Sequence, residues 1–136
     1  MILLLGDIHG DYKVLEHAIQ LAEQTNAAAI IQVGDFGLFR GAGMANETHF
    51  HKVARNSKIP VYFIDGNHDD CDRWAEYTDV ARIWSDANLF YIPRGTVMEL
   101  DGRTIACMGG AASIDKEWRL KDGAHWTPTE NISPAE

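Results

Sequence analysis

The sequence predicts an α/β fold built on a parallel sheet, and three observations support this prediction. Three short apolar runs, each followed within two residues by a glycine, occupy residues 2–5, 29–33 and 61–64, and such runs are typical of buried parallel strands. A helical pattern separates the first two runs, as in the right-handed crossover that joins parallel strands. Asp101-Gly102 lies between two later apolar runs, and this pair strongly favours an antiparallel hairpin.

Periodicity predicts the elements around these strands. Apolar residues recur at helical spacing between the first two runs and indicate a crossover helix; they are Val14, Leu15, Ala18, Ile19, Leu21 and Ala22. After the loop Gly41-Ala42-Gly43, residues 47–57 are expected to form a second, mostly polar helix. Asp70 is a typical helix cap and predicts a short helix after the third run. Three more strands are expected, over residues 89–92, 96–100 and 104–108.

The length and composition are those of one globular domain. With 136 residues, 46% of them hydrophobic and 24% charged, the chain can bury a real core. We expect one domain over residues 1–136, with an irregular segment over 112–136. Ser133-Pro134-Ala135-Glu136 has the residue order of a first helical turn. Either this tail is polar and frayed or the chain is the N-terminal portion of a longer fold, and we expect the second.

The charge and the cysteine content limit which classes of partner and which cellular compartment we expect. A net charge of -8 disfavours non-specific binding to nucleic acid and to anionic membranes. A phosphate substrate is still allowed, because bound divalent cations reverse the local sign. Cys71 and Cys107 are too few for a disulfide framework, and the apolar start ends at Gly6, too soon for a signal peptide. We therefore expect the cytoplasm, with no membrane span.

Each of the first three runs leads into side chains that bind metals. These are found in Asp7-Ile8-His9, Gly34-Asp35 and Gly66-Asn67-His68-Asp69. Because parallel strands end at one edge of a sheet, we expect these side chains to meet in a crevice there. Carboxylate, imidazole and amide donors together suit manganese, iron or zinc better than magnesium. Two carboxylates about 4 Å apart repel by about 4 kcal/mol at an effective dielectric of 20, so Asp7 and Asp35 require a cation or a proton between them.

The order of these motifs resembles the calcineurin-like metallophosphoesterases, whose recurring pieces are D-x-H, G-D and G-N-H-D/E. The resemblance covers residues 1–111. It implies an αββα architecture, a β-sandwich flanked by helices, of which this chain is the N-terminal portion only. The three first strands would share one sheet and the hairpin would begin the other. Exposed apolar surface is then expected, and with it dimerisation or strand exchange.

The resemblance also implies a role for each residue of the site. Asp7 and His9 would bind a first metal ion, Asp35 would bridge two ions, and Asn67 would bind the second. His68 would be catalytic, donating a proton to the leaving group or stabilising the phosphoryl oxygens. The implied function is metal-dependent hydrolysis of a phosphate ester, as a phosphatase or a phosphodiesterase, by metal-activated hydroxide.

The sequence departs from the family in its later histidines. Full members carry two further histidine segments after the hairpin, whereas here only His125 lies downstream and its surroundings resemble neither segment. We therefore expect two divalent ions, manganese foremost, with a weak second site held by Asp35 and Asn67 and with reduced activity. The alternative is a non-catalytic scaffold with the same fold that binds partners. The role of Asp69 stays open between orienting His68 and capping the next helix.

Overall fold

The strands of the protein form two sheets. The computed structural model describes residues 1–38, 44–124 and 126–133. A five-stranded sheet has the order β1-β2-β3-β5-β4, and a two-stranded sheet pairs β6 with β7. The strands are β1 (Ile2–Leu5), β2 (Ala29–Val33), β3 (Val61–Ile64), β4 (Ala81–Arg82), β5 (Leu89–Tyr91), β6 (Val97–Leu100) and β7 (Arg103–Ala106). The helices are α1 (Tyr12–Gln24), α2 (Met44–Asn56), α3 (Cys71–Trp74), α4 (Lys116–Lys121) and the 3₁₀ helix η1 (Pro128–Glu130).

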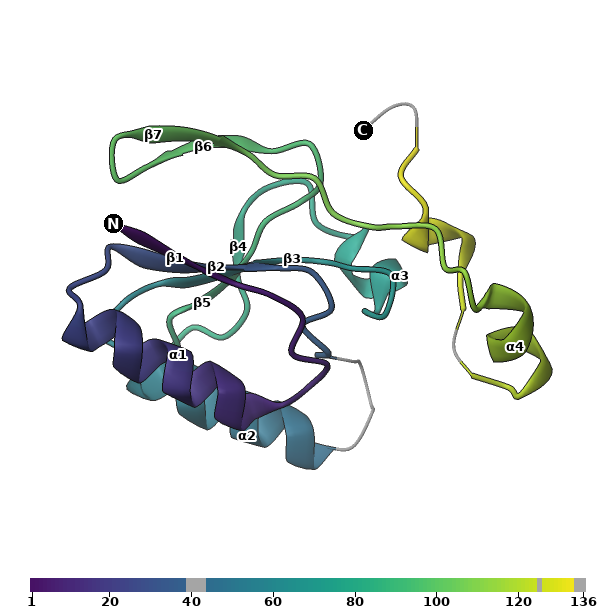
Figure 1. Cartoon of the computed structure of the whole chain (residues 1–136), viewed down its shortest axis with the longest axis horizontal. Coiled ribbons are helices and arrows are strands. Elements are labelled where there is room, and N and C mark those ends of the chain that lie inside the picture. The colour runs from purple at the N-terminus through teal and green to yellow at the C-terminus, as the bar shows by residue number, and fades with distance from the viewer. Residues whose placement is uncertain (39–43, 125, 134–136) are drawn as a thin grey trace.

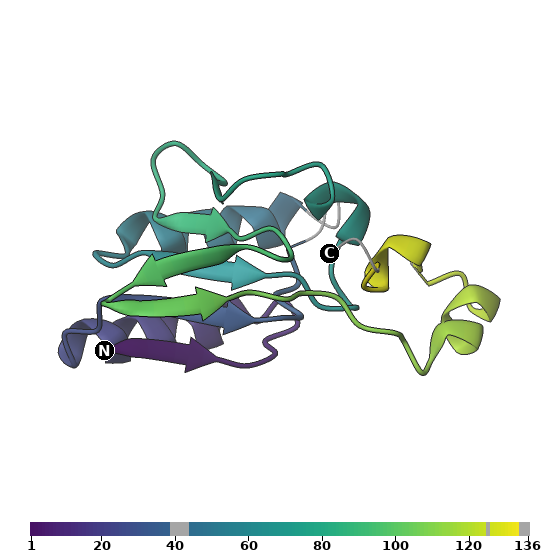
Figure 2. The ribbon, with the colours of Figure 1, turned by 90° about the horizontal axis from the view of Figure 1, so that it is seen from above.

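These elements stack in layers. Helices α1 and α2 lie side by side against one face of the five-stranded sheet, and the β6–β7 hairpin lies over the other face (Figure 1). Seen from above, the hairpin covers part of the larger sheet, while α4 and η1 lie beyond the ends of its strands (Figure 2). This arrangement confirms the predicted α/β class. It also confirms that the first three strands share one sheet and that the hairpin belongs to a second.

The register of the parallel strands places the three motifs at one edge. Leu5 of β1 pairs with Gln32 of β2, and Val33 of β2 pairs with Ile64 of β3. All three strands run in the same direction, so the residues that follow them emerge together. The buried amide of Gln32 donates to the carbonyls of Gly6 and Gly34 and thereby joins the beginnings of the first two loops.

Two apolar clusters hold this edge in place. The larger one packs the inner faces of α1 and α2 against the sheet, where Phe36 stacks on Phe63 at a centroid distance of 4.5 Å. A smaller cluster of Ile64, Ile92 and Cys107 lies between the sheet and the hairpin. Close packing makes such layers stiff, so the loops of the site are mounted on a rigid support.

Some elements differ from the sequence-based expectation. Strand β4 was not predicted, because two residues are too few to show a period. The expectation that residues 112–136 are irregular is wrong for α4 and η1. Asp115, Glu117 and Lys121 stand where a helix start and end favour them, but α4 is only six residues long and exposes Trp118 and Leu120, so no apolar stripe marks it. The predicted loop 41–43 and the helix start beyond Ser133 fall outside the described residues.

Candidate metal centre

Three of the predicted ligands converge at the carboxyl edge of the sheet. Asp7 and His9 follow β1, Asp35 follows β2, and one donor atom from each lies within 4.8 Å of the others. The His9 Nε2 atom is 3.8 Å from Asp35 Oδ2. Asp35 is buried, with 8% of its surface exposed, whereas Asp7 and His9 are exposed. The group therefore has a fixed floor and an open side through which a ligand can enter.

The backbone of these loops is held in an uncommon conformation. His9 has φ 45° and Asp35 has φ 51°, and a left-handed conformation of a residue other than glycine costs on the order of 1–3 kcal/mol. Backbone bonds between the two loops keep them in this form: the His9 N–H donates to the Asp35 carbonyl over 2.9 Å, and the Gly10 N–H donates to the Phe36 carbonyl over 3.0 Å. Such strain is typical of functional sites, where it sets the direction of side chains.

The third loop lies directly on Asp35. A Cβ atom at Gly66 would collide with the Oδ1 atom and the backbone nitrogen of Asp35, so only glycine fits there. Two residues further on, the His68 N–H donates to Asp35 Oδ1 over 2.9 Å. One oxygen of Asp35 is thus positioned by the third loop, and the other faces His9.

Asn67 and His68 complete the set of predicted residues. Asn67 lines a small pocket of about 170 Å³ together with Asp7 and Asp35. The His68 ring meets the His9 ring edge-on, with centroids 5.6 Å apart. The structure therefore brings Asp7, His9 and Asp35 into one group, with Asn67 beside it in the same pocket and His68 on the side of His9.

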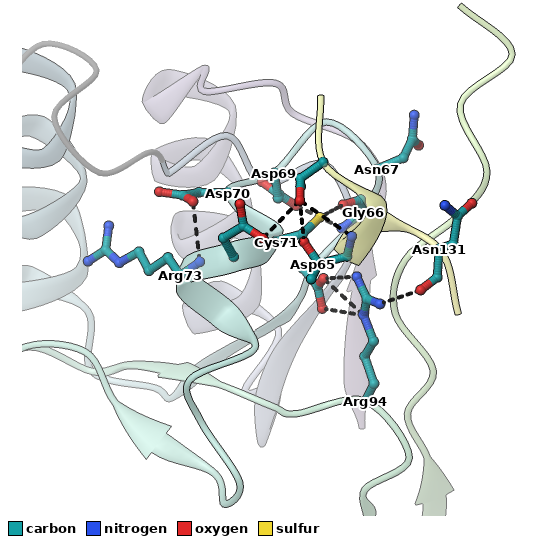
Figure 3. A network of polar contacts seen from close by, with 12 residues as sticks. Asp65, Gly66, Asn67, Asp69, Asp70, Cys71, Arg73, Arg94 and Asn131 are labelled. Carbon is teal, nitrogen blue, oxygen red and sulfur yellow. Dashed lines mark hydrogen bonds and ion pairs between the residues drawn. The ribbon is translucent and has the colours of Figure 1, made fainter. Parts of the chain in front are cut away.

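Asp69 takes a role that the sequence did not suggest. Its two oxygens accept backbone N–H bonds from Phe36 (3.1 Å), Gly37 (2.6 Å) and Gly66 (2.8 Å). Burial raises the pKa of Asp69 to about 6, although these donors act in the opposite direction. The helix cap is Asp70, which accepts from the Arg73 N–H (Figure 3). Asp69 thus fastens the second loop to the third.

A buried ion pair behind the site was also missed. Asp65, the residue before Gly66, accepts from Arg94 Nε over 3.0 Å and from the Tyr91 hydroxyl over 2.9 Å. Arg94 reaches on to the carbonyl of Asn131, so the pair joins the end of β3 to the C-terminal segment (Figure 3). Only the position of Asp65, at the end of an apolar run and beside a motif, could have signalled its importance.

The donor set fits a divalent cation. Carboxylates, an imidazole and an amide form a mixed oxygen and nitrogen set of the kind that binds manganese, iron or zinc. Asp7 and Asp35 offer oxygens within 4.8 Å of each other and of a His9 nitrogen. Two carboxylates this close repel each other unless a positive charge or a proton lies between them.

Comparison with known families agrees with this geometry. The family model described as calcineurin-like phosphoesterase matches residues 1–133. The chain therefore belongs to the calcineurin-like phosphoesterase family, a class of metal-dependent hydrolases of phosphate esters. No curated protein sequence matches the chain significantly. Among the described residues, no helix has the length and apolar character needed to cross a membrane.

Proposed function

We propose that this chain hydrolyses a phosphate ester with the help of divalent cations bound at the carboxyl edge of its larger sheet. The observation that carries the proposal is the meeting of Asp7, His9 and Asp35, whose donor atoms lie within 4.8 Å of one another. The family supports the reaction class. The shared pocket of Asp7, Asp35 and Asn67 supports the same place for the substrate.

We assign each ligand of the proposed centre to one or both of two ions. Asp7 and His9 would hold one ion, Asp35 would contact both ions, and Asn67 would hold the other. Bound divalent cations stabilise charge on a phosphoryl group and make water a stronger nucleophile. The mixed donor set suits manganese, iron or zinc, and of these we propose manganese. We propose that the second ion binds more weakly, because Asp35 and Asn67 are the two donors assigned to it.

His68 is the proposed general acid. Its backbone is fixed by the bond from its N–H to Asp35 Oδ1, and its ring lies against that of His9. A protonated ring nitrogen at this position would donate to the oxygen of the leaving group as the ester bond breaks. In the alternative role named for His68, the ring N–H would donate a hydrogen bond to a phosphoryl oxygen and keep its proton.

The substrate is proposed only by class. A pocket of about 170 Å³ is smaller than the ~300–1,000 Å³ of typical small-molecule sites, which supports binding of the phosphoryl group itself with the rest of the ester outside. Phosphoproteins, nucleotide diesters and small phosphate monoesters all meet this condition. We also propose the cytoplasm as the location, which the two buried free thiols of Cys71 and Cys107 support.

The proposed function is tested with chromogenic esters. We expect p-nitrophenyl phosphate or bis(p-nitrophenyl) phosphate to be hydrolysed with added manganese and not with a chelator. Asp35→Asn should lower the rate by more than about 100-fold, because it changes a direct metal ligand. Mutation of a residue that only orients such a ligand already costs about 10–100-fold. Asp86→Asn, at an exposed carboxylate paired with His51, is the control and should leave the rate unchanged. Absence of turnover with both esters, unaffected by Asp35→Asn, would favour the scaffold instead.

A further inference from the structure

A ring of polar contacts lies beside the third motif and consists of Ser113, Arg119 and Glu130. The Nη1 atom of Arg119 donates to Ser113 Oγ over 2.7 Å and to Glu130 Oε2 over 3.3 Å. The other carboxylate oxygen, Glu130 Oε1, accepts from the backbone N–H of Ser113 over 3.0 Å. Ser113 is therefore fixed both at its backbone and at its hydroxyl group.

The charged members of this ring are buried. Only 5% of Arg119 and 1% of Glu130 are exposed, although they come from the separate short helices α4 and η1. Removing two charges from water costs about as much as their attraction returns, so added stability is a weak explanation for such a pair. What the pair does supply is a fixed geometry for Ser113.

Two further contacts connect the ring to Asn67. The amide nitrogen Nδ2 of Asn67 donates to Ser113 Oγ over 3.0 Å, and Arg119 Nη1 donates to the backbone carbonyl of Asn67 over 3.4 Å. Because arginine has no acceptor atom, Ser113 Oγ must present a lone pair to it. The same hydroxyl oxygen accepts a hydrogen bond from the amide nitrogen of Asn67. The amide oxygen of Asn67 is then the atom that can bind a cation.

We infer that the ring of Ser113, Arg119 and Glu130 positions Asn67 so that its amide oxygen, and not its nitrogen, serves the metal centre. This inference rests on the proposed function. Ser113 is a positioning residue, because it acts through Asn67. Mutation of a group that orients a metal ligand commonly lowers metal affinity by about 10–100-fold. That loss should fall on the ion that Asn67 binds and should spare the ion assigned to Asp7 and His9.

The test is a calorimetric titration of manganese into the metal-free full chain and its variants. In Ser113→Ala we expect the weaker binding event to lose at least about tenfold in affinity and the tighter event to stay as in the wild type. Ser113→Thr keeps the hydroxyl oxygen and should restore the weaker event. Arg119→Lys keeps the charge beside Glu130 but lacks the planar fork, and it should weaken the same event.

The matched control is Ser57→Ala. The Ser57 hydroxyl is also hydrogen-bonded, donating to the Ile59 carbonyl over 2.7 Å, but it lies before β3, at the opposite end from Asn67. Ser57→Ala should change neither binding event, and thermal unfolding establishes that each variant is folded.

If Ser113→Ala does not fold, the manganese affinity of Arg119→Lys tests the inference in its place. Unchanged affinities in both variants, or an equal loss in Ser57→Ala, overturn this inference and leave the proposed function standing. A wild type that binds no manganese overturns both.

Discussion

At Gly66 the absence of a side chain decides whether Asp35 can be a ligand. Gly66→Ala would drive a Cβ atom into Asp35 Oδ1 and the Asp35 backbone. We expect a loss of about 1–3 kcal/mol in stability, as for other overpacked sites, together with weaker manganese binding because Asp35 must move. Chemical denaturation and calorimetry measure the two effects.

Gly6→Ala is the control for that prediction. Like Gly66, Gly6 lies just past a strand and precedes a predicted metal ligand, but a Cβ atom at Gly6 meets nothing within 4 Å. The free energy of unfolding of Gly6→Ala should differ from that of the wild type by no more than about 0.5 kcal/mol, as for surface substitutions away from special features. Equal effects of the two substitutions would contradict the close approach of Gly66 to Asp35.

Asp69 predicts a pH dependence of stability. Burial raises its pKa from 3.8 to about 6 in the folded protein, so the folded state binds the proton more tightly than the unfolded state does. The resulting stabilisation is complete below about pH 4 and is lost as the pH rises through 6, with a total of about 3 kcal/mol. Denaturant unfolding of the metal-free protein in chelator measures it.

Asp69→Asn isolates this effect. Asparagine does not titrate, so the difference in unfolding free energy between the wild type and Asp69→Asn should fall as the pH increases from 4 to 7. The lost acceptor for one backbone N–H shifts the whole curve but does not depend on pH. A difference that is constant with pH would show that Asp69 keeps an ordinary pKa.

At the scale of elements, the Asp65–Arg94 pair joins β3, the β5–β6 connection and the C-terminal segment. Both side chains are buried, so Arg94→Ala leaves an uncompensated carboxylate and should cost about 3–5 kcal/mol. Arg55→Ala breaks an exposed pair with Asp86 and should cost far less than Arg94→Ala. Denaturant unfolding at one pH compares them, and similar losses would be evidence against the buried pair.

The predictability of these elements follows from their length and burial. Strands β1, β2 and β3 were predicted with their observed bounds, because each is an almost wholly apolar run with a glycine within the next two residues. The start of α2 was placed at residue 47 and lies at Met44, as is usual where a helix has a mostly polar surface. Strand β4 and helix α4 are too short, at two and six residues, to show a hydrophobic period, although the charges at the ends of α4 are of the kind that helix ends favour.

At the scale of the whole molecule, an apolar face of the larger sheet is open. Beside the hairpin, 70% of Leu4 and 45% of Val33 are exposed, and they line a groove of about 590 Å³ with Met1 and Ile31. Large exposed apolar patches mark interaction sites. The homodimer expected from the sequence stays a prediction, and this face is where the second copy would bind.

Light scattering after size exclusion tests the dimer. We expect the mass of two chains for the wild type and of one chain for Leu4→Glu, because a charge on this face would be buried without a partner. Glu16→Gln, on the outer helix α1, is the control and should keep the wild-type mass. A wild type that elutes as a monomer at every concentration contradicts the prediction.

The sequence by itself determined the residue types of the site and the edge at which they meet. Asp7, His9, Asp35, Asn67 and His68 each follow an apolar run, and parallel strands necessarily end together. Tertiary structure alone decided how these side chains are held. Asp69 accepts a backbone hydrogen bond that joins two loops, and the missing side chain of Gly66 leaves room for Asp35. Ser113 accepts a hydrogen bond from the amide of Asn67. These contacts join residues that lie 31 or more positions apart in the chain, and a local pattern records which side chains follow a strand but not which distant atoms they meet.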